Sequence, residues 1–116
     1  MGVVWLVGFS RDRCDEIGAA LQAEGFAASE VVDHELPGRT DRGDVIVFDL
    51  DRVEPCDLER CRKEHDVPIL ALVSGRDASG PISAFEAGAD DVVRRPHYPR
   101  EVALRVRALM RTVRTR

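Results

Sequence analysis

The sequence has no apolar segment long enough to cross a membrane. A transmembrane helix needs about 20 consecutive apolar residues, whereas the first apolar run is only VVWLV, which ends before Gly8. We therefore expect no signal peptide, no membrane anchor and a cytoplasmic protein. The chain has 116 residues, 44% of them hydrophobic, which predicts one domain with a substantial core and no room for a second.

Cysteine is also scarce. The three cysteines, Cys14, Cys56 and Cys61, are an odd number without C-x-x-C spacing. Because Cys14 and Cys61 fall in segments that we predict to be helical, reduced thiols are expected rather than a disulfide or a metal site. The sequence indicates no metal and no cofactor.

The net charge changes sign along the chain, from acidic in the body to basic at the end. Residues 1–93 hold 9 Lys and Arg against 20 Asp and Glu, whereas residues 94–116 hold 8 Arg against Glu101 alone. An arginine-rich last helix can bind nucleic acid. We expect instead that most of these arginines face acidic neighbours, and that nothing in these 116 residues reads DNA bases.

Hydrophobic periodicity predicts strands that alternate with helices. The apolar runs typical of strands lie at 3–7, 26–32, 44–50, 69–73 and 91–93. Helical patterns occupy 12–24, 57–65, 81–87 and the stretch from Pro99 onward. Val-, Ile- and Leu-rich strands that alternate with helices predict a doubly wound, five-stranded parallel sheet of the flavodoxin-like α/β class.

One crossover departs from this alternation. A connection between parallel strands needs about a dozen residues or more, and the segment 33–43 is polar, contains Pro37-Gly38 and has almost no apolar stripe. We therefore expect the second helix to be short or missing.

The most informative stretch runs from Phe85 to Arg111 and reads FEAGADDVVRRPHYPREVALRVRALMR. Gly88 is a helix stop, Arg95-Pro96 forces a turn, and Pro99 suits the first position of a new helix. This stretch resembles the last strand and helix of bacterial response-regulator receiver domains of the OmpR/PhoB type. The resemblance implies a (βα)5 receiver fold and a role in phosphorelay signalling.

The resemblance also implies a phosphoacceptor at Asp49. This residue ends the strand DVIVFDL, which is similar to the DLVLLDL of receivers. Sites in open α/β sheets form at the carboxyl ends of the strands. Asp49 is the predicted equivalent of the aspartate that accepts a phosphoryl group from a histidine kinase; the alternative is an acid that caps the following loop.

The metal ligands and the hydroxyl that such receivers use are changed. The acidic pair that would hold Mg²⁺ falls at Gly8 and Phe9, and Asp12 is poorly placed to substitute. The Thr or Ser position falls at Val73, or at Ser74 if the alignment shifts by one residue.

The remaining switch positions are changed as well. Val92 stands where an aromatic residue is usual, and Arg95 stands at the lysine position. We expect Arg95 to pair with Asp49 and the Arg95-Pro96 bond to be cis. These departures indicate an atypical receiver, or pseudo-receiver, for which conventional phosphorylation by a histidine kinase is not expected.

The surface that the resemblance implies for dimer formation retains more of the family's residues than the phosphorylation site does. It comprises the helix at 81–87, the strand at 91–93 and the last helix, with the charges Asp90, Asp91, Glu101, Arg105 and Arg107. We predict a homodimer through this face that forms without phosphorylation. The alternative is a solvated charged surface.

The leading hypothesis is that residues 1–116 are the regulatory domain of a bacterial transcription regulator. DNA contacts would then come from a winged-helix domain beyond Arg116. The alternatives are a stand-alone protein-interaction adaptor and a small-ligand sensor that uses the pocket at Asp49. An enzyme is least expected, because the sequence does not bring a general base, a nucleophile and an orienting group together. We expect His97 to lie at the surface.

Overall fold

The computed structural model describes residues 2–31 and 38–114, apart from the side chains of Val113 and Arg114. In chain order its elements are β1 (Val3–Val7), α1 (Arg11–Ala23), β2 (Ala27–Val31), β3 (Val45–Asp49), α2 (Pro55–Glu64), β4 (Ile69–Val73), α3 (Ser79–Ala87), β5 (Asp91–Arg94) and α4 (Pro99–Arg114). The strands form one parallel sheet in the order β2-β1-β3-β4-β5. The predicted flavodoxin-like fold is confirmed.

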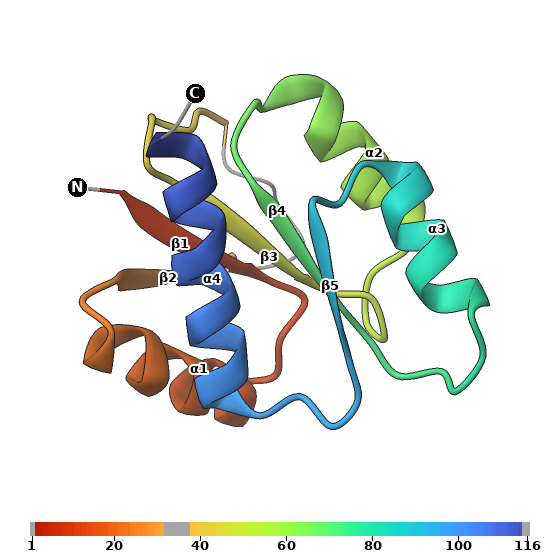
Figure 1. Ribbon diagram of the computed structural model, residues 1–116, viewed down its shortest axis with the longest axis horizontal. Helices are drawn as coiled ribbons and strands as arrows, with labels where there is room; N and C mark the ends of the chain where they lie inside the picture. Colours follow the sequence, from red (N-terminus) through yellow and green to blue (C-terminus); the bar gives the residue numbers. More distant parts are fainter. Residues whose placement is uncertain (1, 32–37, 115–116) are drawn as a thin grey trace.

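The helices cover the two faces of the sheet in pairs. Helices α1 and α4 lie on one face, and α2 and α3 lie on the other (Figure 1). Ile17 of α1 and Val102 and Val106 of α4 are fully buried in the first layer, and Leu58 and Cys61 of α2 are fully buried in the second. Because both faces are covered, the strands are apolar on both sides, and every residue of β4 is buried.

Local signals position the helices. Ser10 is the N-cap of α1, and its hydroxyl accepts a hydrogen bond from the backbone N–H of Arg13 at 3.3 Å. Gly88 ends α3 with φ of 116°, and a Cβ added there would lie 2.6 Å from Cγ of Arg62. Glycine is therefore required at residue 88 both by the backbone and by the neighbouring side chain.

The crossover between β2 and β3 is only partly described. Residues 38–44 contain no helix, and residues 32–37 of the predicted crossover lie outside the described residues. The described part ends at Asp44, whose carboxylate accepts hydrogen bonds from the backbone N–H groups of Val3 and Asp41 at 2.8 and 2.9 Å and from Trp5 Nε1 at 3.2 Å. Burial works against ionisation of this carboxyl, but the hydrogen bonds prevail and hold the pKa of Asp44 below its ordinary value.

No helix within residues 2–31 and 38–114 is both long and apolar enough to span a bilayer.

Candidate functional site at the carboxyl edge of the sheet

Asp49 is the last residue of β3 and lies, half-buried, at the carboxyl edge of the sheet. Its Oδ1 accepts a hydrogen bond from the backbone N–H of Asp51 at 3.0 Å. Burial raises the pKa of Asp49, and the charge of Asp51 acts in the same direction. The N–H of Asp51 and the charges of His97 and Arg13 oppose that rise only in part.

The two positions that would hold the metal ligands have other functions here. Gly8 has φ of 88°, and a Cβ added to it would lie 3.0 Å from Cγ1 of Val53 and 3.3 Å from the Asp49 carbonyl oxygen. Phe9 is 7% exposed and packs in the apolar layer beneath α1 and α4. Among the described residues, no group of three or more His, Cys, Asp or Glu side chains is arranged to hold a metal ion. The residues around Asp49 therefore do not fit Mg²⁺ bound in the way that the resemblance implies.

The expected pairing of Arg95 with Asp49 is wrong. Arg95 is exposed, and no ion pair or hydrogen bond joins these two described residues. The Arg95-Pro96 bond is cis as predicted. The backbone N–H of Arg95 donates to the Val73 carbonyl at 3.0 Å, and the side chain borders a hollow that Arg76 and Arg94 also line.

Two other side chains, His97 and Arg13, act by charge to lower the pKa of Asp49. Nε2 of His97 lies 2.6 Å from the Val73 carbonyl oxygen. Because a carbonyl oxygen only accepts, Nε2 carries the proton in this contact. His97 is half-buried, so its expected surface position is only partly right. Arg13 Nη2 donates to the His97 carbonyl at 3.1 Å, and its Nη1 pairs with Glu16 at 3.2 Å.

Sequence reasoning missed Arg13. Its only local signal is its position three residues after the cap Ser10, which places it in the first turn of α1 above the carboxyl ends of the strands. Its partner His97 is 84 residues away in sequence, so a pattern within one segment does not find the pair.

The residues at the predicted switch positions, Val73, Ser74 and Val92, differ in burial and in their contacts. Val73 is buried at the end of β4, and the hydroxyl of Ser74 donates to the carboxylate of Asp51 rather than to that of Asp49. Val92 is half-buried and packs against the apolar layer beneath α2 and α3. A hydroxyl is therefore present at this edge, but it contacts the neighbouring acid.

Three of the five predicted dimer-face charges form one cluster. Arg105 of α4 pairs with Asp91 of β5 at 3.3 Å and with Glu101 one helical turn away at 3.6 Å. Arg107 lies on another side of α4 and pairs with Glu24, the C-cap of α1, at 3.2 Å. Arg107 is thus directed away from the face on which the sequence placed it.

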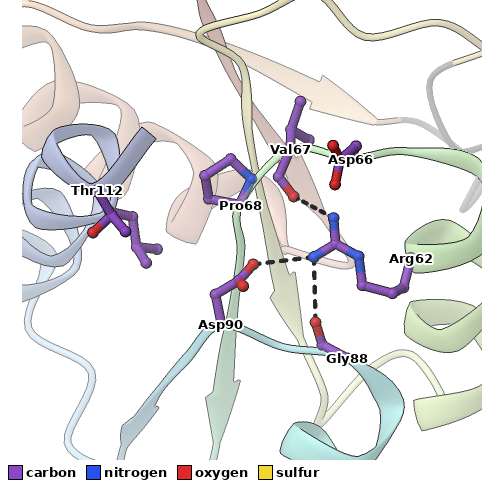
Figure 2. A pocket seen from close by; sticks show the side chains of 8 residues that line it. Arg62, Asp66, Val67, Pro68, Gly88, Asp90 and Thr112 are labelled. Carbon is purple, nitrogen blue, oxygen red and sulfur yellow. Dashed lines mark hydrogen bonds and ion pairs between the residues drawn. The ribbon is translucent and has the colours of Figure 1, made fainter. Parts of the chain in front are cut away.

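The carboxylate of Asp90 pairs with Arg62 of α2 (Figure 2). Its Oδ2 lies 3.0 Å from Nη1 of Arg62 and accepts a hydrogen bond from the backbone N–H of Ile69 at 2.8 Å. Arg62 also donates to the carbonyls of His65, Val67 and Gly88 at 2.8, 2.7 and 3.3 Å. Asp90 therefore ties the start of β5 to β4 and α2, which leaves it little freedom for an intermolecular contact.

Three large apolar side chains are exposed on α3 and just before α4. Ile82 and Phe85 are spaced i, i+3 on α3 and are 52% and 51% exposed, and Tyr98, just before α4, is 63% exposed. Single exposed apolar residues are ordinary, and Ile82 and Phe85 lie on the helix that the sequence assigned to the dimer face.

Known proteins with similar sequences are transcriptional regulatory proteins. The chain is 36% identical over 118 residues to the transcriptional regulatory protein CreB of Escherichia coli, a match that covers 95% of this chain and 51% of CreB. It is 33% identical over 99 residues to the transcriptional regulatory protein ResD of Bacillus subtilis, covering 78% of this chain and 40% of ResD. No family model matches the sequence.

Solved structures agree on the fold. A response regulator from Thermotoga maritima superposes with a TM-score of 0.80 at 23% identity, over 96% of this chain and 98% of that one. The receiver domain of the TMAO respiratory system response regulator TorR superposes with a TM-score of 0.76 at 21% identity, over 97% and 99%.

The chain is a response-regulator receiver domain of the OmpR/PhoB type. It spans about half the length of CreB and less of ResD. Asp49 ends β3, where the sequence predicts the phosphoacceptor equivalent, and α3, β5 and α4 carry the residues that the sequence predicts for dimer contacts.

Proposed function

We propose that this receiver is the regulatory part of a transcription regulator and that it acts without conventional Mg²⁺-dependent phosphorylation. The observation that carries the proposal is the replacement of the expected metal ligands by Gly8 and Phe9, the first with a left-handed backbone and the second buried in the core. DNA contacts would belong to a further domain beyond Arg116, since the relatives that are transcriptional regulatory proteins are about twice as long.

Electrostatics at Asp49 supports this proposal. A phosphoryl group on a carboxylate brings about two negative charges, and receivers that use Mg²⁺ neutralise them with the metal. Here the adjacent acid Asp51 would repel the phosphoryl oxygens, and the side chains that act by charge to lower the pKa of Asp49 are His97 and Arg13. Both side chains already make hydrogen bonds within the protein. Phosphorylation of Asp49 would therefore leave a poorly compensated charge.

We also propose that the receiver transmits its signal as a homodimer. If phosphorylation does not shift the equilibrium, the dimer must form unaided or with a partner's help. The cluster of Asp91, Glu101 and Arg105 supplies charge of both signs, and Ile82 and Phe85 supply apolar area. Exposed ion pairs contribute only about 0 to 1 kcal/mol each, so the apolar pair must provide part of the contact and micromolar affinity is expected.

Sedimentation velocity over a concentration series up to ~100 μM tests the dimer. The wild type is expected to dimerise, and the dimer should weaken in high salt and in Arg105→Glu. Arg60→Glu is the matched control, because Arg60 also pairs within its own helix, with Asp57 at 3.3 Å, but lies on α2. A wild type that stays monomeric, or a dimer that both variants weaken equally, would contradict this interface.

A further inference from the structure

Three arginines from two segments of the chain line one hollow at the carboxyl edge of the sheet. Arg76 lies in the loop that follows β4, Arg94 is the last residue of β5, and Arg95 follows it. Together with Ser74 and Gly75 they border an open hollow of about 490 Å³. The loop after β4 and the end of β5 lie at the same edge of the sheet (Figure 1).

These three arginines have no carboxylate partner among the described residues. Seven other basic side chains of the described chain do have one within 3.7 Å, namely Arg11, Arg13, Arg60, Arg62, Lys63, Arg105 and Arg107. The nearby Asp77 is engaged mainly by Ser79, whose N–H and hydroxyl donate to its Oδ1 at 3.1 and 2.6 Å, and the charge of Arg94 acts on it more weakly. In a chain with a net charge of −4, three arginines beside one carboxylate leave a local excess of positive charge, which attracts an anion.

One of the three guanidinium groups is held in place. Nη2 of Arg94 donates to the carbonyls of Arg76 and Asp77 at 2.9 and 2.8 Å, which ties the end of β5 to the loop after β4. Its Nε and Nη1 make no hydrogen bond within the described residues and remain available. A donor that is already ordered loses less conformational freedom when a ligand binds.

We propose that this hollow binds the diphosphate group of a small molecule. Guanidinium groups match pairs of phosphate oxygens in a fork, and such charge-assisted hydrogen bonds are the strong ones. Gly75 offers close approach, since a Cβ there would meet only Oδ1 of Asp77, at 3.8 Å. The volume falls within the range of roughly 300 to 1,000 Å³ that is usual for small-ligand sites. Binding would require neither a metal nor Asp49, so this inference stands apart from the proposed function.

Isothermal titration calorimetry in the presence of EDTA tests the proposal, with pyrophosphate and ADP as probes. The test variant is Arg76→Gln/Arg95→Gln, because neither side chain makes a hydrogen bond or ion pair among the described residues and the fold should be unaffected. The matched control is Arg39→Gln/Arg42→Gln, which removes two exposed arginines from the crossover before β3. An unchanged unfolding temperature in both variants verifies the fold.

The expected result is saturable binding of a diphosphate by the wild type, weakened at least tenfold in Arg76→Gln/Arg95→Gln and no more than twofold in the control. Tighter binding of ADP than of pyrophosphate would assign the site to a nucleotide, and equal binding would assign it to a free diphosphate. Absence of saturable binding of both probes at 5 mM would overturn the proposal, and so would equal weakening in the two variants, which marks nonspecific attraction of anions.

Discussion

Replacing Arg62 with alanine should destabilise the receiver more than any other single change to a charged side chain on α2. The guanidinium group donates to three backbone carbonyls and pairs with Asp90, and its side chain is only 25% exposed. It holds the end of α2, the start of β4 and the loop before β5 together. Truncation would remove all four contacts at once.

The size of the loss follows from the strength of these contacts. A hydrogen bond to a charged group contributes about 1.5 to 3 kcal/mol, but water can reach part of this site and replace some of the lost donors. The two shortest bonds, to Val67 and His65 at 2.7 and 2.8 Å, are expected to dominate. We expect Arg62→Ala to lower the free energy of unfolding by about 3 kcal/mol, which corresponds to a fall in Tm of roughly 10 °C for a domain of this size.

Urea unfolding followed by circular dichroism measures this loss, with Arg60→Ala as the control. Arg60 is 60% exposed and makes one ion pair within its own helix, so its removal should cost at most about 0.5 kcal/mol. Arg62→Lys should recover less than half of the loss, because an ammonium group does not span the same acceptors. A cost below 1 kcal/mol for Arg62→Ala would refute the reasoning.

Two further predictions concern the pH dependence of stability. The pKa of Asp44 is lowered in the folded state, so the ionised carboxylate stabilises the fold above its unfolded pKa, and this stabilisation is lost as the pH falls through the folded pKa. The Asp44→Asn variant should therefore have a lower free energy of unfolding than the wild type at pH 7. Urea titrations at decreasing pH should also show that the variant loses less stability in acid. The pKa of Asp49 is raised, so its ionised form opposes folding near neutrality. Asp49→Asn should therefore increase the free energy of unfolding at pH 7, and the gain should shrink as the pH falls through the folded pKa. An Asp49→Asn variant less stable than the wild type at pH 7 would contradict the assigned direction.

Local signals in the sequence account for most of the fold. The run ILALV predicted β4 to the residue, because apolar strands of a covered parallel sheet have abrupt polar boundaries. Helix α2 begins two residues before its predicted start, at Pro55, since proline suits the first helical turn. Helix α3 also begins two residues early, at Ser79, where the N-cap Ala78 provides no side-chain signal.

The contacts of the site were less accessible to sequence reasoning, because they join distant segments. Counting along the chain located Asp49 at the correct edge of the sheet, but it assigned the wrong cation to it. Arg95 lines a hollow with Arg76 and Arg94, and His97 contacts the end of β4. Directions of side chains beyond a turn depend on the tertiary structure, and a motif match does not contain them.

Phosphorylation of Asp49 tests the central claim most directly. The purified receiver is incubated with Mg²⁺ and acetyl phosphate, and its intact mass is measured beside that of Asp49→Asn and of a receiver that retains the acidic pair. We predict no stable gain of mass by this protein under conditions in which the control receiver is phosphorylated, because Gly8 and Phe9 provide no carboxylate for the metal. A gain of one phosphoryl group that disappears in Asp49→Asn would contradict the account.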